Sequence, residues 1–178
     1  LSVRAQWKIG KNGLEAELAR IEFAGPDAAG SAQGRYRNSG EGPGAIDLTA
    51  TLTRADARAV WRYMPRVVGD STRLWLRDSL LSGRASEAKL TLKGNLEDFP
   101  FVDKSKGLFL VTVKAEDVDL DYGTGWPKLG NIYGNLRFEG KSMVVDAQRG
   151  SILGAKVSRT RAEIPDLDAQ DPVLLVKG

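Results

Sequence analysis

"FLVTVKAEDVDLDY", residues 109–122, is the part of the sequence that says most about the architecture. Apolar residues occupy every second position from Phe109 to Ala115, and the alternation resumes one position out of phase at Val118. A period of two is typical of a β-strand with one buried face and one wet face. A slip of one position is typical of a β-bulge or bend. The stretch therefore predicts a long, bent strand.

Four carboxylates crowd into the second half of this strand: Glu116, Asp117, Asp119 and Asp121. The three aspartates match the first, third and fifth positions of a calcium-binding EF-hand loop. That loop requires Gly at its sixth position and Glu at its twelfth, where this chain has Tyr122 and Lys128. The aspartates also share one face of the strand, opposite Val118, where a half-buried strand meets water. We therefore interpret them as a solvated face and predict no metal site.

The same two-residue period runs through most of the chain. Turn residues such as Gly13, Gly140 and Gly150 join the alternating stretches by short connections, which favours antiparallel neighbours. The pattern predicts roughly nine or ten strands in an antiparallel meander.

The period changes in the middle of the chain. Residues 57–64 place apolar side chains at spacings of three and four, which predicts one apolar face of a helix. Thr53 and Asp56 resemble a capping box at its start. Residues 69–83 read as a second helix that ends at its final glycine. Together the two predict a helical hairpin.

The predicted fold class is mainly β with a small α part: an antiparallel, curved or twisted sheet with one helical hairpin. The alternation fits both an open groove and a partly closed sandwich. Because the chain begins and ends in strand-like sequence, we expect residues 1–178 to be a single β-rich domain excised from a longer protein. Within it we expect N-terminal strands in 1–52, the hairpin in 53–83 and C-terminal antiparallel strands in 84–178.

Composition excludes several kinds of chemistry. The chain has no Cys and no His, which excludes disulfides, a cysteine nucleophile and a Ser-His-Asp triad. Its net charge is +3 with scattered Lys and Arg, so we expect no nucleic-acid binding. A glycan hydrolase would need two acids facing each other across a cleft, and the outward phase of the acids argues against it. We expect a protein that is not an enzyme, with no catalytic residues, no metal and no cofactor.

Three local features each have two readings. Residues 98–101, DFPF, could be a docking motif, but we expect an apolar plug at one end of the sheet. Trp126, which precedes a proline, could be a ligand platform, but we expect a packed turn. Arg62, Arg66 and Arg73 could contact anionic headgroups, but we expect a solvated helix face.

An ordered set of short motifs gives the chain a family resemblance. The motifs are RYMP at 62–65, the segment from Gly94 to Phe101, Tyr122, the pair Trp126–Pro127, and the segment from Gly134 to Gly140. In this order they resemble the central domain of the YhdP branch of the AsmA-like proteins of Gram-negative bacteria. The similarity is best over about residues 60–157.

The resemblance implies a very long periplasmic protein that is anchored in the inner membrane by an N-terminal helix. Such proteins are similar to bridge-like lipid-transfer proteins, in which a long, curved β-sheet forms an apolar groove for phospholipid between the inner and outer membranes. The implied partners are phospholipid acyl chains, adjacent segments of the same long chain, and envelope proteins at its ends. No catalytic residues come with the family.

A groove for acyl chains needs only apolar side chains, because each buried CH₂ contributes about 0.8 kcal/mol without directional bonds. From their phase, the residues expected to line it are Leu90, Leu92, Phe109, Val111, Val113, Leu136 and Phe138. The helical hairpin would serve as a lid or end cap. The alternative is a structural or protein-interaction module, a β-sandwich scaffold with a dry, closed core and no bound lipid.

Overall fold

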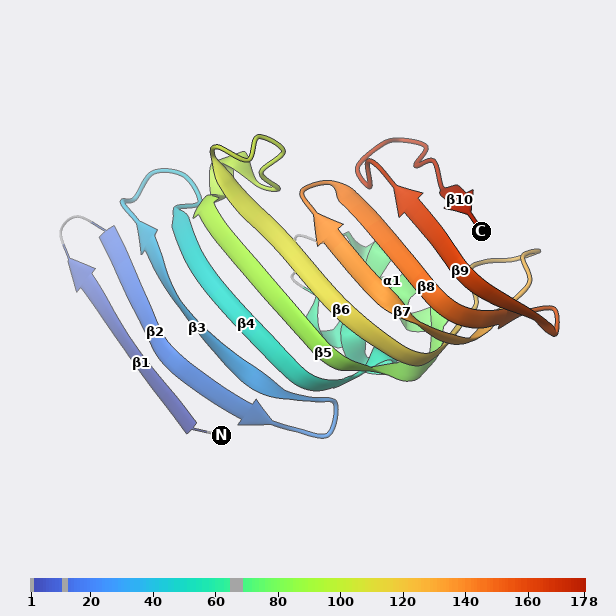
Figure 1. The fold of residues 1–178 in the computed structure, drawn as a ribbon. Helices are drawn as coiled ribbons and strands as arrows, with labels where there is room; N and C mark the ends of the chain where they lie inside the picture. The colour runs from blue at the N-terminus through green and yellow to red at the C-terminus, as the bar shows by residue number, and fades with distance from the viewer. Residues whose placement is uncertain (1, 11–12, 65–68) are drawn as a thin grey trace.

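The strands form one continuous sheet, seen in a computed structural model that describes residues 2–10, 13–64 and 69–178, with side chains in the last two ranges. Ten strands lie in chain order, and each pairs antiparallel with the next (Figure 1). They are β1 (Ser2–Gly10), β2 (Gly13–Ala24), β3 (Ala28–Asn38), β4 (Ala45–Asp56), β5 (Leu80–Asn95), β6 (Gly107–Leu120), β7 (Leu129–Glu139), β8 (Ser142–Ile152), β9 (Ala155–Ile164) and β10 (Leu175–Lys177). The sheet does not close into a barrel, which confirms the predicted mainly β, antiparallel fold.

Two helical segments connect β4 to β5, but they are shorter than expected. The first, η1 (Ala57–Tyr63), is a 3₁₀ helix, and the second, α1 (Asp70–Ser79), is α-helical. The hairpin was expected to fill 53–83, yet β4 continues to Asp56 and β5 begins at Leu80. Strand pairing takes these residues, because Asp56 lies opposite Arg84 in the ladder. A further 3₁₀ turn, η2 (Leu96–Asp98), follows β5.

The predicted capping box at Thr53 and Asp56 is confirmed for Asp56 and wrong for Thr53. Asp56 caps η1, since its carboxylate accepts the backbone N–H of Arg58 at 2.9 Å. Thr53 instead belongs to β4, and its hydroxyl donates to the carbonyl of Ala29 at 3.3 Å. The residue therefore supports strand pairing rather than helix initiation.

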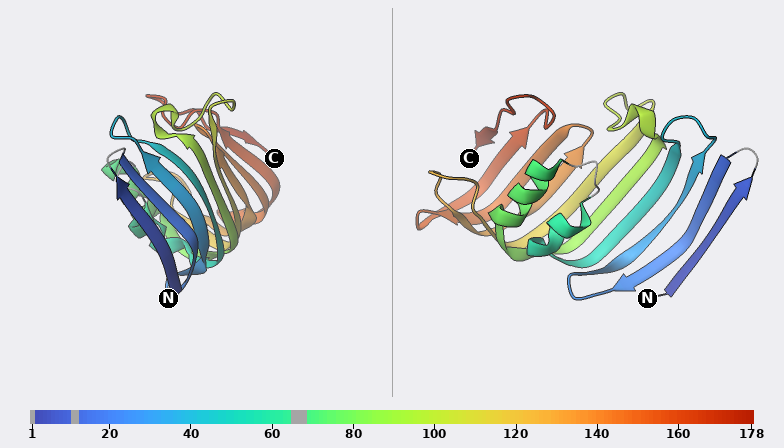
Figure 2. Two further views of the ribbon diagram at one scale, coloured as in Figure 1. Left: turned by 90° about the vertical axis from the view of Figure 1, so that its left-hand side faces the viewer. Right: turned by 180° about the vertical axis from the view of Figure 1, so that it is seen from behind.

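Phase slips in the sequence correspond to irregular ladders. In β6 the register shifts between Ala115 and Val118, and Asp117 has a φ of 55°. In β2 the register shifts between Leu18 and Ile21. Bulges bend a strand and increase its twist, and the sheet is visibly curved (Figure 2).

Cross-strand register joins the alternating residues into continuous rows. We call the face that they share the apolar face. The first row crosses β2 to β9: Ile21, Ala32, Ala50, Leu90, Val111, Phe138, Met143 and Ile164. The second crosses β2 to β10: Phe23, Gly30, Leu52, Ala88, Val113, Leu136, Val145, Ala162 and Val176. The third crosses β2 to β6: Leu18, Gly34, Leu48, Leu92 and Phe109.

The opposite face, which we call the outer face, carries charge. Directly opposed residues of neighbouring strands form ion pairs there: Glu17–Arg35, Glu15–Arg37, Asp47–Lys93, Glu116–Arg84 and Asp146–Arg161. Exposed pairs of this kind contribute only about 0–1 kcal/mol each. Their main effect is on strand register, because a slip of one residue would bring these charges to the apolar face.

Both helices lie on the concave side of the sheet, at one end of the strands (Figure 2). A row of small residues crosses the sheet at this end: Ala28, Ala55, Ala85, Ala115, Gly134 and Ala147. Small side chains let η1 pack closely against β4 and β5, where Ala59 is buried. We call this the helix-bearing end.

Phe101 closes the apolar face at the opposite end of β5 and β6. It is 3% exposed, and its ring lies over Gly94 and Gly107, where any added Cβ would collide with it. Phe99 packs beside it against the ring of Phe109, with ring centroids 5.2 Å apart. The expected apolar plug in residues 98–101 is therefore present.

Phe101→Ala is expected to lower the free energy of unfolding by about 3–5 kcal/mol, because it empties the most buried aromatic site of the described chain. Phe99→Ala, whose ring is 42% exposed, should cost roughly 1 kcal/mol. Urea denaturation of both variants measures the difference. Equal losses would show that Phe101 does not close that end.

Candidate functional site

The predicted lining residues lie together on the apolar face. Leu90, Val111 and Phe138 are consecutive members of the first row. Val113 and Leu136 are neighbours in the second row, and Leu92 and Phe109 are neighbours in the third. The seven residues therefore form one contiguous patch on β5, β6 and β7.

The apolar face is wider than those seven residues indicate. It also includes Leu48 and Ala50 of β4, Met143 and Val145 of β8, and Ile164 of β9. Each of these lies in an alternating stretch of the sequence, so their strand faces could have been predicted. Their place in a shared row could not, because it depends on the register between strands.

No large side chain among the described residues is fully buried. Hydrophobic burial in this part of the chain is limited to Ala59, Ala88, Phe101 and Ala115, while the larger residues of the first row are only half-buried. A closed sandwich would bury such side chains between two sheets. The apolar face is thus open between the helix-bearing end and the Phe101 plug.

The first row is long compared with a lipid. It crosses eight strands, and seven spacings of ~4.8 Å give a path about 34 Å long. The hydrocarbon core of a whole bilayer is about 30 Å thick, so one acyl chain spans about half of that distance.

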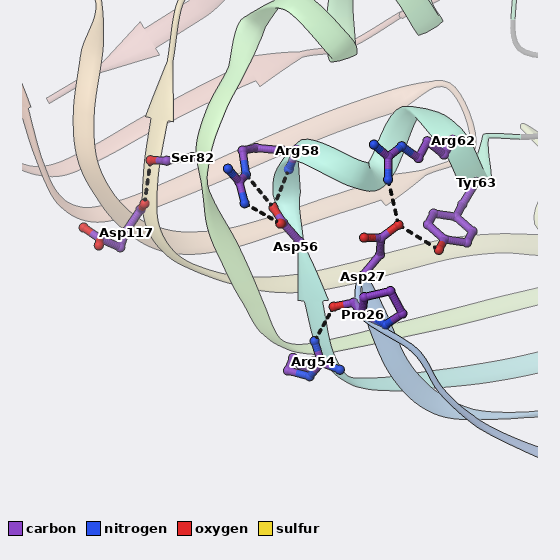
Figure 3. Close-up of polar contacts among 9 residues, drawn as sticks. All are labelled: Pro26, Asp27, Arg54, Asp56, Arg58, Arg62, Tyr63, Ser82 and Asp117. Atoms are coloured by element: carbon purple, nitrogen blue, oxygen red, sulfur yellow. Dashed lines mark hydrogen bonds and ion pairs between the residues drawn. The ribbon is translucent and has the colours of Figure 1, made fainter. Parts of the chain in front are cut away.

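Polar contacts fix η1 to the loop between β2 and β3 (Figure 3). Asp27 accepts hydrogen bonds from the Arg62 guanidinium and the Tyr63 hydroxyl, both at 3.1 Å. Arg54 donates to the carbonyl of Pro26 at 2.8 Å. These bonds hold the helix-bearing end in a defined position beside the apolar face.

A shallow hollow of about 300 Å³ lies next to this network, between the ends of β4 and β5. Three arginines contribute to its lining: Arg54, Arg58 and Arg84. Arg58 pairs with Asp56 and Arg84 pairs with Glu116, both at 2.9 Å, while Arg54 is held by backbone carbonyls. The three guanidinium groups therefore form hydrogen bonds within the protein that join η1, β4, β5 and β6 around the hollow.

α1 is tied to the segment that follows β6. The indole N–H of Trp75 donates to the carbonyl of Tyr122 at 3.1 Å, and the two rings meet edge to face at 6.2 Å. The Trp126 ring meets the Tyr122 ring edge to face, with centroids 5.9 Å apart, but Trp126 is 67% exposed. The expected turn is present, since the backbone N–H of Trp126 donates to the carbonyl of Gly123 at 3.1 Å, but the expectation that Trp126 is packed is wrong.

The acids of the opening stretch have separate partners. Asp119 accepts the backbone N–H of Asn131 at 2.9 Å, and Asp121 pairs with Lys128 at 3.1 Å. Within residues 2–10, 13–64 and 69–178, no group of three acids is placed to hold a metal ion. In the same ranges, no helix combines the length and the apolar character that a membrane crossing requires.

An open antiparallel sheet with one continuous, half-buried apolar face defines a class of β-protein that presents a long apolar surface. The sequence profile of the YhdP protein family matches residues 1–178, and the chain belongs to that family. It is 23% identical over 161 residues to the intermembrane phospholipid transporter YhdP of Escherichia coli (strain K12). The alignment covers 90% of this chain and 13% of the relative's length. No solved structure matches the chain.

Ionisation of Asp56 is expected to stabilise the helix-bearing end. The hydrogen bond from the Arg58 side chain lowers the pKa of this carboxyl below its ordinary value of 3.8. Because the pKa is lower in the folded chain, the stabilisation is present above the unfolded pKa and is lost as pH falls through the folded one.

Asp56→Asn keeps a capping side chain but removes the charge. We expect it to lower the free energy of unfolding by roughly 0.5–1 kcal/mol at pH 7, with the difference from the unmodified chain shrinking as the pH approaches 3. Denaturation curves over this pH range measure it. A difference that is independent of pH would contradict the assignment.

Proposed function

We propose that this chain is a non-enzymatic segment of a phospholipid-transfer protein, and that its apolar face holds the acyl chains. The observation that carries the proposal is the first row, which is apolar on eight consecutive strands and only half-buried along its length. The printed name of the relative, an intermembrane phospholipid transporter, supports phospholipid as the ligand.

The energetics suit transport as well as binding. Burying about ten methylenes on the apolar face would contribute roughly 8 kcal/mol before the costs of ordering the chain. Contacts of this kind have no preferred direction, so a chain that moves from one strand to the next exchanges one set for an equivalent set. A flat energy profile of this kind permits sliding along the row.

We further propose that this β-rich domain is one part of a longer, inner-membrane-anchored protein in the periplasm, with phospholipid moving between inner and outer membranes. The family and the small fraction of the relative's length that is covered support this placement. β1 and β10 lie at the two edges of the sheet, where adjacent segments of the same chain would extend the apolar face. Envelope proteins at the two ends of the full-length protein are proposed partners.

The scaffold alternative fits the structure less well. A sandwich module needs a second layer over the apolar face, and in the described ranges the only cover comes from the two helices and the Phe101 plug. A lipid ligand accounts for the uncovered part without a second protein layer.

Leu136 and Arg137 provide a matched test, because they are adjacent in β7 and lie on opposite faces. In the full-length protein, a photo-crosslinking residue in place of Leu136 of this chain should form adducts with labelled phospholipid in cells. One in place of Arg137 should not. Mass spectrometry of the adducts identifies the lipid. With folded protein and a working control site, an absence of adducts at both positions would favour the scaffold.

A further inference from the structure

Among the arginines whose side chains are described, Arg73 is the one that is not exposed. The other arginines of β4, η1, α1 and β5 each have a described partner: Arg54 with the carbonyls of Gly25 and Pro26, Arg58 with Asp56, Arg62 with Asp27, Arg77 with Asp78, and Arg84 with Glu116. Among the described residues, no carboxylate lies within ion-pair distance of Arg73. Residues 1–12 and 65–68, whose side chains are not described, include no Asp or Glu. The charge of Arg73 is therefore not neutralised by this chain.

The side chain also lies on the covered face of its helix. Arg73, Leu76 and Ser79 recur every third residue, and they are the members of α1 that are not exposed. This face packs toward η1 and β5. The sequence predicted that Arg62, Arg66 and Arg73 lie on a solvated helix face. Arg62 is exposed and pairs with Asp27, which agrees, and Arg66 lies outside the described residues. Arg73 is not exposed, so the prediction is wrong for this residue.

One nitrogen of this guanidinium lacks a partner. The Nε of Arg73 is sealed from solvent and has no hydrogen-bond partner in the described part of the chain. A buried, unmatched donor costs about 1–3 kcal/mol, and more when the group is charged. The neighbouring sheet offers no compensation, because the small-residue row at this end carries alanine and glycine rather than acceptor side chains.

We propose that Arg73 binds the phosphate of a phospholipid whose acyl chains lie on the apolar face. The two terminal nitrogens of a guanidinium form a planar fork that matches phosphate oxygens in a bidentate arrangement, so the phosphate need not reach the sealed Nε. An amphiphile fits this location because its phosphate would meet an arginine that is partly covered and has no carboxylate partner among the described residues, while its chains would lie on the apolar face of the same sheet. The inference rests on the proposed function and adds to it a headgroup position.

The test uses the full-length protein with the crosslinking residue at position 136, incubated with vesicles that contain either phosphatidylglycerol or diacylglycerol of the same chain length. Arg73→Gln should reduce phosphatidylglycerol adducts by roughly tenfold, the loss expected for a charge-assisted hydrogen bond. Arg77→Gln is the matched control on the exposed side of the same helix, and it should leave them unchanged. Diacylglycerol adducts, which need no phosphate partner, should be equal in all three proteins.

Each other outcome contradicts the assignment in a distinguishable way. Equal loss of both lipids in Arg73→Gln would mean that the residue only supports the fold, and the proposed function would stand without it. If Arg77→Gln lost as many phosphatidylglycerol adducts as Arg73→Gln, the loss would be due to the change in net charge and not to a site at Arg73. Broadening of the inorganic phosphate ³¹P signal by the unmodified protein but not by Arg73→Gln would assign a free-phosphate site instead. A complete lack of adducts with either lipid would remove the proposed function and this inference together.

Discussion

An apolar sheet face has to be covered, and this constraint governs the rest of the structure. Cross-strand register aligns apolar side chains into rows that run through eight or nine strands. Two short helices lie on the concave side at one end of the strands, and one phenylalanine plug covers the other end of β5 and β6, so the rows between them are left without a second layer. Water is a poor solvent for the remaining surface, and the proposed acyl-chain ligand would cover it.

The features around the rows keep this surface open. Charged pairs on the outer face oppose a one-residue slip of the strands, and bulges in β2 and β6 bend the sheet. The hydrogen bonds of Asp27 hold η1 at the rim, and Trp75 ties α1 to the segment after β6. The helices are thereby fixed at one end of the strands instead of lying over the centre of the apolar face. This arrangement gives a potential ligand an apolar floor with a polar rim.

The rim has two parts with different properties. Around η1, arginines and acids satisfy one another, so that region stabilises the fold without unmet charge. On the covered side of α1, Arg73 has neither a partner for its Nε nor a carboxylate among the residues that the structure describes. The contrast arises from positions only a few residues apart, since Arg77 is exposed and paired with Asp78.

Strand faces could be predicted well from the sequence, because alternation is a local property that survives folding. Phe109, Val111 and Val113 therefore lie on the apolar face, and the slip before Val118 is a real bulge. Prediction failed where distant pairing outweighed local preference, as at residues 80–83, which read as helix but join β5 opposite β6. Trp126 was also misjudged, because its exposure depends on a loop conformation that no periodicity encodes. The lack of a described partner for the Arg73 Nε depends on how α1 packs against its neighbours, so it could not be predicted from the sequence.

Val144 and Val145 offer the most direct test of the central claim that the apolar face holds acyl chains. The two residues are identical and adjacent, but Val145 lies opposite Leu136 and Ala162 on the apolar face, whereas Val144 lies opposite Arg137 and Glu163 on the outer face. Their methyl NMR signals would be followed while adding phospholipid with a nitroxide near the end of an acyl chain. If the apolar face holds acyl chains, the Val145 methyl signals should broaden strongly and the Val144 signals should change little. Equal broadening at both, or none at either, would contradict it.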